Sequence, residues 1–154
     1  MKLDFLDTSN RERILQFLNV VDKDFAPALS SRVDLGKYAD KLAGDATNLF
    51  AVADGLDIAH AAFYCNDEQS KVAYLSSIGV LPRFQRSGVA GRLLEECLRR
   101  CFAKDMRRIE LEVNAENKKA IRFYKKHGFR FVSDTIMQRS CCKPKPDPSA
   151  PPQS

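Results

Sequence analysis

The chain has 154 residues, a length that suits one domain with one hydrophobic core. Its composition, 44% hydrophobic and 29% charged, is typical of a globular protein. No apolar run approaches the roughly 20 residues that cross a bilayer, and the first seven residues lack the basic and apolar regions of a signal peptide. We therefore expect a cytoplasmic protein with no membrane partner.

The first half of the chain is predicted to form a strand, two helices and three further strands. A short strand around Leu3 and Phe5 precedes a capping box at residues 9–12 and a helix whose apolar residues recur at helical spacing up to Val21. Asp34 is placed to cap the second helix. Short polar turns between the three strands indicate an antiparallel meander. These strands are expected at residues 48–53, 58–65 and 71–80.

The second half of the chain alternates helical and strand patterns. From Gly88 the apolar residues recur at helical spacing up to Cys101, and Ile109–Val113 follows as a strand. Asn117 is placed to cap another helix, and Gly128 to end it in the left-handed conformation. Two last strands are expected at residues 129–132 and 136–139.

The predicted element order is β-α-α-β-β-β-α-β-α-β-β, and only the passage 72–113 requires a parallel pair of strands. We therefore predict an α/β (α+β) fold: a mixed, mostly antiparallel twisted sheet with helices on both faces. The domain is expected to span residues 1–139. The segment 140–154 contains five prolines and little apolar bulk, so we expect a disordered tail.

Five cysteines in a chain without a signal peptide are expected to be reduced thiols. Cys97 and Cys101 lie four apart in a helical pattern, so they share one face and are interpreted as small core residues. The histidines, His60 and His127, are distant in sequence, and no metal site is predicted. Cys141-Cys142 falls in the polar tail, where no role is expected for it.

The net charge of +5 is compatible with nucleic acid or with a multiply phosphorylated cofactor, and its placement favours the cofactor. Arg83, Arg86 and Arg92 surround Gly88, at which a strand and a tight turn lead into a helix. The first N–H groups of a helix have no partner within it and attract anions, so a diphosphate fits there. The alternative is a glycine required only by the local geometry. Because no recognition helix or aromatic-basic pattern is present, nucleic acid is not an expected partner.

Two segments resemble the signatures of the GNAT acetyltransferases. Gln85-Arg86-Ser87-Gly88-Val89-Ala90 resembles the family's Q/R-x-x-G-x-G/A motif. Residues 114–129 resemble the second signature, through Asn117, Ala120, the pair Phe123-Tyr124 and the pair Gly128-Phe129. The two segments occur in the family's order and at its spacing.

The resemblance implies acetyl-CoA as cosubstrate. In such proteins a bulge, for which Gly79 is the predicted place, splays the third meander strand from the next one, and the pantetheine arm pairs with the opened edge. The N–H group near Val80 would polarise the thioester carbonyl. Asn117 and Lys118 would contact the cofactor. The predicted cofactor-binding residues are Ile78, Gly79, Val80, Gln85, Arg86, Ser87, Gly88, Val89, Ala90, Gly91, Arg92, Asn117, Lys118 and Tyr124.

The resemblance also implies a proton donor at Tyr124, since a phenol can protonate a leaving thiolate. The strand that carries a base in many relatives has Tyr74, Leu75, Ser76 and Ser77 here. Glu112 is the predicted base, at a spacing from Tyr124 similar to that in bacterial protein N-terminal alanine acetyltransferases. The alternatives are that Glu112 lies on a solvated face or pairs with a lysine, and that ordered water serves as the base.

The acceptor is predicted to be a primary amine of a small molecule or a peptide, which approaches over the first two helices. If Arg32 binds an anion, an amino-sugar nucleotide or an amino acid is expected. If the acids Asp22 and Asp24 dominate, a polyamine or a peptide amine is expected. The alternative function is a module that binds acetyl-CoA without transfer. The sequence does not determine the oligomeric state, and a homodimer is one of the alternatives.

Overall fold

The computed structural model describes residues 1–141, and these form one seven-stranded sheet in the order β1-β2-β3-β4-β5-β7-β6. Only β4 and β5 pair in parallel, so the predicted mixed fold and element order are confirmed. The strands are β1 (Asp4–Asp7), β2 (Thr47–Ala53), β3 (Leu56–Tyr64), β4 (Val72–Val80), β5 (Arg108–Glu112), β6 (Arg130–Phe131) and β7 (Ile136–Ser140). The helices are α1 (Arg11–Val21), α2 (Leu35–Asp45), α3 (Val89–Ala103) and α4 (Lys118–Lys126), with short 3-10 turns η1 (Asp22–Asp24), η2 (Leu29–Ser31) and η3 (Pro82–Phe84).

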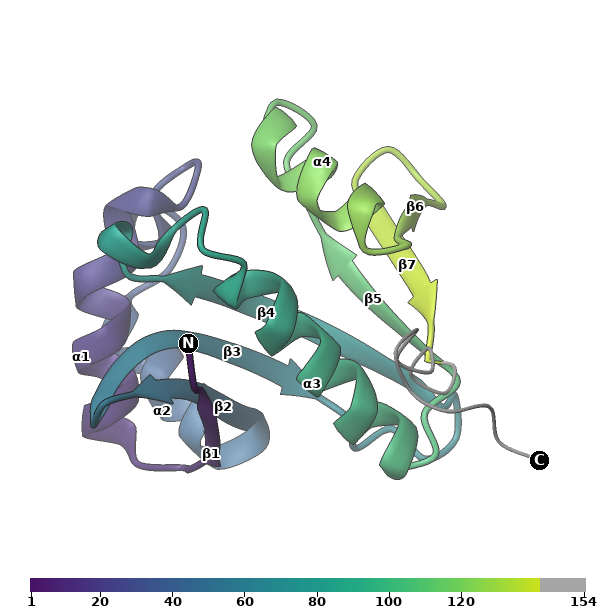
Figure 1. Ribbon diagram of the computed structural model, residues 1–154. Coiled ribbons are helices and arrows are strands. Elements are labelled where there is room, and N and C mark those ends of the chain that lie inside the picture. Colours follow the sequence, from purple (N-terminus) through teal and green to yellow (C-terminus); the bar gives the residue numbers. More distant parts are fainter. Residues whose placement is uncertain (142–154) are drawn as a thin grey trace.

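Helices cover both faces of the sheet, and each face has its own core (Figure 1). Helix α3 crosses one face, where Leu93, Leu94 and Cys97 are fully buried against the strands. Helices α1 and α2 pack together on the other face, around buried residues such as Ile14 and Leu42. Cys97 and Cys101 belong to α3 and are both buried in the core on that face, which confirms their interpretation as core residues. None of the helices in residues 1–141 has the length and apolar character needed to span a bilayer.

The helix caps largely agree with the sequence. The side chains of Asp34 and Asn117 accept hydrogen bonds from the third amide of their helices, and Gly128 has a φ of +89°. The predicted capping box that begins at Ser9 is wrong. Helix α1 begins one residue later, because Asn10 has the extended backbone of a capping residue and its Oδ1 accepts from the Arg13 amide at 3.2 Å.

The end of the described chain differs from the predicted tail. Strand β7 runs to Ser140, and Cys141 is buried with its amide donating to the Arg107 carbonyl at 2.8 Å. The interpretation of Cys141 as a residue of a polar tail is therefore wrong, because its thiol packs in the core with Cys101. The rest of the predicted tail, with Cys142, lies outside the described residues.

The sheet opens between β4 and β5, as Figure 1 shows. The two strands pair only where Val72–Tyr74 lies beside Arg108–Glu110, so the edge of β4 beyond Tyr74 faces no β5 partner. This is the predicted splay, but the prediction of a bulge at Gly79 is wrong. The β3–β4 register steps from Ala62↔Ser77 to Phe63↔Leu75, which makes Ser76 the extra residue.

Gly79 pairs regularly with His60. A Cβ at Gly79 would lie 3.2 Å from Cγ2 of Val21 and 3.4 Å from Phe25, so the glycine is required by the close approach of α1 and the segment that follows it. A glycine at position 79 therefore does mark a structural constraint, but the constraint is the lack of space for a side chain and not a bulge in the strand.

Candidate active site

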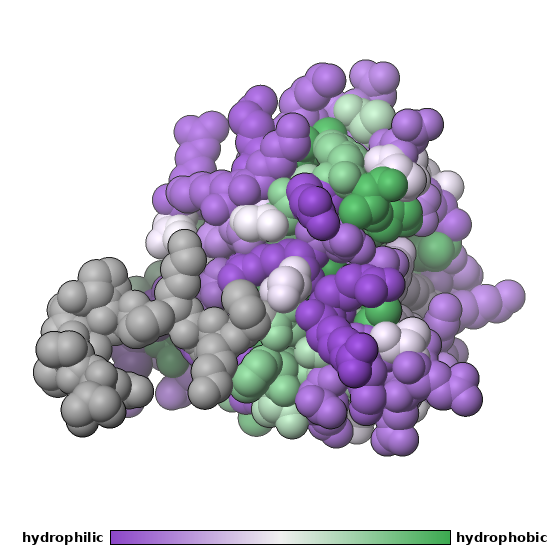
Figure 2. Space-filling model, turned by 90° about the vertical axis from the view of Figure 1, so that its right-hand side faces the viewer, coloured by the Kyte–Doolittle hydropathy of each residue, from purple (hydrophilic) through white to green (hydrophobic). Residues whose placement is uncertain are grey.

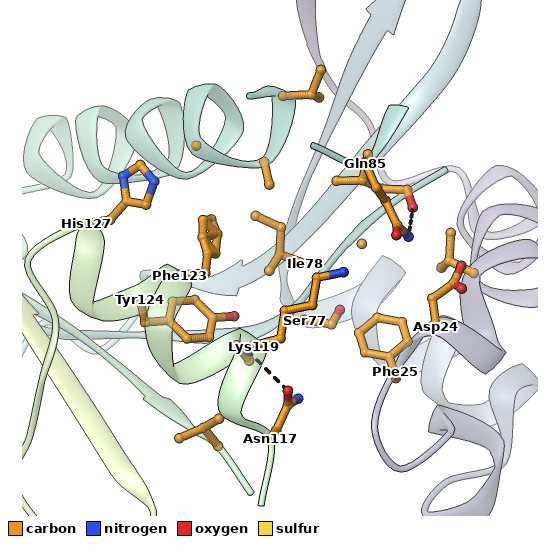
Figure 3. Close-up of a pocket in the computed structure, with 18 of the residues that line it drawn as sticks. Asp24, Phe25, Ser77, Ile78, Gln85, Asn117, Lys119, Phe123, Tyr124 and His127 are labelled. Carbon is orange, nitrogen blue, oxygen red and sulfur yellow. Dashed lines mark hydrogen bonds between the residues drawn. The ribbon is translucent and has the colours of Figure 1, made fainter. Parts of the chain in front are cut away.

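A cavity of about 910 Å³ lies where β4 and β5 separate. Its walls come from the segment after α1, from β4, from the turn before α3 and from α4 (Figure 3). Most of the residues predicted for the site meet here. The predicted residues that line it are Ile78, Gly79, Val80, Gln85, Arg86, Gly88, Val89, Ala90, Gly91, Arg92, Glu112, Asn117 and Tyr124.

Two predicted cofactor residues do not line the cavity. The Ser87 hydroxyl donates instead to the Phe84 carbonyl within the turn. Lys118 is exposed at the first position of α4, and its neighbour Lys119 lines the cavity in its place. The helical pattern predicted a lysine near the cofactor but not which of the two adjacent ones faces it.

The turn before α3 presents free backbone amides to the cavity. Gln85 ties the turn to the end of β4, because its Nε2 donates to the Val80 carbonyl at 3.2 Å. Arg86 and Gly88 both have left-handed backbones, with φ of +66° and +85°. The first intrahelical bond runs from the Arg92 amide to the Gly88 carbonyl, and no side chain in residues 1–141 caps this helix. The Ser87 amide donates to the Phe84 carbonyl, whereas the amides of Gly88–Gly91 are available to an anion.

A Cβ at Gly88 would meet no atom within 4 Å, so the glycine is required by its positive φ and not by crowding within the protein. Of the three arginines predicted around it, Arg86 and Arg92 line the cavity. The Arg92 guanidinium donates to the Met1 carbonyl at 2.8 Å, whereas the Arg83 guanidinium lies over the Phe84 ring, 5.0 Å from its centre, and does not line the cavity.

Further positive charge lies on α4. Lys118, Lys119, Arg122, Lys125 and Lys126 are all exposed, and the helix contains no acidic residue. Seen from the side of β5, β7 and α4, the surface is mainly hydrophilic, with apolar residues between the charged ones (Figure 2). Because Lys119 and Lys126 also line the cavity, α4 adds cations to the wall opposite the turn before α3.

Tyr124 projects from α4 into the cavity, as Figure 3 shows. Its ring packs edge-on against Phe129, with centres 5.5 Å apart, and beside Phe123. Burial, with a smaller contribution from Cys97, raises the pKa of Tyr124 above its ordinary value of 10.0. The phenol therefore carries its proton throughout the neutral range and is placed to give it to a group in the cavity.

Glu112 lies at the end of β5 and lines the cavity with an exposed side chain. No cation of residues 1–141 forms a salt bridge with it, which answers the alternative of a lysine partner for the described part of the chain. Burial, and secondly the nearby Glu112 carboxylate, raise the pKa of Tyr74 on the adjoining strand. The Glu112 carboxylate is exposed to solvent, as the alternative of a solvated face predicted.

The segment between α1 and α2 forms the opposite wall, with Asp24, Phe25 and Arg32 among its lining residues. Asp22, which the sequence suggested for substrate contact, holds this segment together with Ser30 instead. The Asp22 carboxylate accepts from the amide and the hydroxyl of Ser30, both at 2.6 Å, and these bonds lower the pKa of Asp22.

Sequence reasoning missed His127, which lines the cavity at the end of α4. A Cβ at Gly91 would lie 2.9 Å from Cε1 of the His127 ring, so this glycine lets α4 approach α3. His127 Nδ1 lies 3.6 Å from Glu95 Oε1, which also accepts from Arg139 at 3.1 Å. The one available signal was a glycine inside a helix, where it is unfavourable unless a neighbour needs the space.

Comparisons with known proteins agree with this arrangement. Residues 14–129 match the model of the acetyltransferase (GNAT) family, whereas a search of curated proteins found no match. Solved structures with the same fold include the ribosomal-protein-S18-alanine N-acetyltransferase of Escherichia coli, with 19% identity, a TM-score of 0.72 and coverage of 95% of this chain and 97% of that one.

Two further structures of this fold contain the cofactor. The PaiA N-acetyltransferase of Thermoplasma acidophilum, in complex with coenzyme A, is 18% identical over 91% of this chain and 99% of that one, with a TM-score of 0.68. A GNAT family acetyltransferase from Elizabethkingia anophelis with acetyl-CoA bound is 13% identical over 90% and 97%, with a TM-score of 0.69. The family model covers well over half of the chain, and the chain therefore belongs to the GNAT family of acetyltransferases.

Proposed function

We propose that the protein transfers the acetyl group of acetyl-CoA to a primary amine by direct attack in a ternary complex. The observation that carries this proposal is one continuous cavity, which joins the uncapped start of α3, the unpaired edge of β4 and the hydroxyl of Tyr124. Acetyl-CoA is the cosubstrate that this combination fits, because it has a diphosphate, an amide-containing arm and a thioester in that order.

The cofactor would bind along this path. Its pyrophosphate would accept hydrogen bonds from the amides at Gly88–Gly91, with Arg86 and Arg92 beside them. The pantetheine arm would pair with the edge of β4 at Ile78–Val80, which has no β5 partner. The thioester would then lie in the opening between β4 and α4.

The transfer step needs one proton acceptor and one proton donor. The neutral amine nitrogen attacks the thioester carbonyl carbon, and the Val80 amide would stabilise the resulting oxyanion. The carbon–sulfur bond then breaks, and Tyr124 protonates the departing thiolate. The proton that the amine loses goes to Glu112 or to water, and the tyrosinate regains a proton from solvent. We assign Glu112 the role of base because its exposed carboxylate lines the cavity without a salt-bridge partner in residues 1–141.

Two measurements separate transfer from binding alone. Calorimetry with acetyl-CoA should show binding to the wild-type protein. A thiol-release assay over a panel of spermidine, glucosamine, serine and a tripeptide with a free N-terminal alanine should show turnover with at least one amine. Binding without turnover over the whole panel would favour a module that binds acetyl-CoA and does not transfer it.

Tyr124→Phe tests the proton donor. We expect kcat to fall by about a hundredfold or more, the usual range for loss of a general acid, with the affinity for acetyl-CoA retained. Tyr64→Phe is the matched control, because it removes a buried hydroxyl from a residue that does not line the cavity. An unchanged kcat in Tyr124→Phe would remove this residue from the mechanism.

Asp24 and Arg32 carry opposite charges, and both line the wall formed by the segment between α1 and α2, which we call the acceptor wall. The charge of this wall therefore does not select one class of amine, and the panel includes several classes. The peptide in the panel is included because the Escherichia coli structure is named for an alanine acceptor in a ribosomal protein. Arg32→Ala would weaken the use of acceptors that carry a carboxylate or phosphate and leave spermidine unaffected.

A further inference from the structure

Ser77 carries a buried hydroxyl to which the proposed mechanism assigns no hydrogen-bond partner. The residue is 7% exposed, and its Oγ has no hydrogen-bond partner among residues 1–141. Only one other buried side-chain oxygen or nitrogen in this part of the chain, the Tyr64 hydroxyl, is also unpartnered. A buried hydroxyl without a partner is unfavourable, so such a group in a cavity indicates a partner that binds there.

The bulge in β4 decides which way Ser77 points. Its strand partner Ala62 belongs to the core under α1 and α2. A Cβ at Gly79, two residues on and thus on the same face, would contact Val21 and Phe25. Ser77 therefore faces the α1 side of the sheet, and Figure 3 shows its hydroxyl in the cavity beside Phe25.

Tyr124 lies across the cavity from Ser77. It projects from α4, and Figure 3 shows its hydroxyl directed toward Ser77 and Ile78. The two hydroxyls thus flank the opening between β4 and α4 from opposite walls. With Tyr124 on the α4 wall to protonate the thiolate, the β4 wall that carries Ser77 remains open to an amine that approaches one face of the thioester carbonyl.

We propose that Ser77 positions the acceptor amine, by accepting a hydrogen bond from the amine N–H at the floor of the acceptor wall. This inference rests on the proposed transfer of acetyl to an amine and adds a positioning residue to it. A hydroxyl suits this role, because it can accept from a neutral amine without stabilising the protonated form that cannot attack.

The neighbouring Ser76 shows why Ser77 alone is available. The Ser76 hydroxyl forms a hydrogen bond with the Tyr38 hydroxyl of α2 and is therefore engaged within the protein. Ser77 also lies on the opposite face from α3, at whose start the pyrophosphate is proposed to bind. Its removal should consequently affect the amine and leave the cofactor unaffected.

The test compares Ser77→Ala with Tyr64→Phe in the full chain, using the panel amine with the highest wild-type kcat/KM. Each variant removes one of the two unpartnered buried hydroxyls, so neither should lower Tm. For Ser77→Ala we expect kcat/KM for the amine to fall about tenfold, as for the loss of one hydrogen bond, mainly through a higher amine KM. The KM for acetyl-CoA should stay within about twofold of wild type, a smaller change than the about tenfold effect expected for the amine. Tyr64→Phe should leave both constants unchanged.

The outcomes separate the two proposals. If the wild-type protein binds acetyl-CoA but acetylates no amine in the panel, the proposed function fails and the role of Ser77 fails with it. If the wild type is active and Ser77→Ala has unchanged amine kinetics, only the role of Ser77 fails. A lower Tm, or an equal loss of affinity for acetyl-CoA and amine, would show that Ser77 supports the fold instead.

Discussion

His60 connects the buried core to the candidate site and makes the stability of the fold sensitive to acid. It is 1% exposed, packs against the Phe50 ring with ring centres 4.7 Å apart, and pairs with Gly79 on β4. Its Nε2 lies 3.0 Å from Oδ1 of Asn48. Because Nδ2 of Asn48 donates to the Leu42 carbonyl at 2.8 Å, the Asn48 oxygen must accept, and His60 Nε2 carries the proton.

Burial lowers the pKa of His60 from 6.5 to about 3. The unfolded chain therefore binds a proton near pH 6.5, whereas the folded protein keeps the ring neutral until about pH 3. The stability from the neutral ring is fully present above pH 6.5 and is lost as the pH falls through this window. At about 1.4 kcal/mol per unit below pH 6.5, the loss between pH 7 and pH 5 is about 2 kcal/mol.

Urea unfolding of the wild type and of His60→Gln at pH 7, 6 and 5 measures this contribution. Glutamine keeps a donor for Asn48 but does not titrate, so the wild type should lose about 2 kcal/mol more than the variant between pH 7 and pH 5. The comparison uses the change in the free energy of unfolding with pH, so a pH-independent cost of the substitution cancels. The carboxylates contribute to this change equally in both proteins. Equal losses in the two proteins would refute a neutral, buried His60.

Substitution of two glycines at the candidate site should lower the stability of the fold. Gly88→Ala should cost about 1–2 kcal/mol because of the left-handed backbone, whereas the control Gly44→Ala in α2, with open space around its Cβ, should be neutral or stabilising in the same urea experiment. Gly91→Ala should cost about 1–3 kcal/mol by overpacking against His127, and most of this cost should disappear in the double variant with His127→Ala. If the costs of the two single substitutions simply add in the double variant, the proposed overpacking between residue 91 and His127 would be contradicted.

The fold was predictable because most of its determinants are local. Asp34, Asn117 and Gly128 mark helix ends by their own hydrogen bonds or backbone angles, and these marks survive in the structure. The turn at Gly88 was predictable for the same reason. The approach of His127 to Gly91 was not, because it depends on how α4 packs against α3 and neither residue has a local signal for the other.

The position of the β4 bulge is the clearest case of a non-local determinant. Strict alternation would place Ser76 and Ser77 on opposite faces of the sheet. The extra residue in β4 lets both face α1 and α2, while Leu75 and Ile78 on either side pack toward α3. Two adjacent serines thus line one wall of the cavity: Ser76 is bonded to Tyr38, and Ser77 has no hydrogen-bond partner within residues 1–141. The register of β3 against β4 therefore places Ser76 and Ser77 on the same side of the cavity, and no pattern within residues 72–80 alone contains that register.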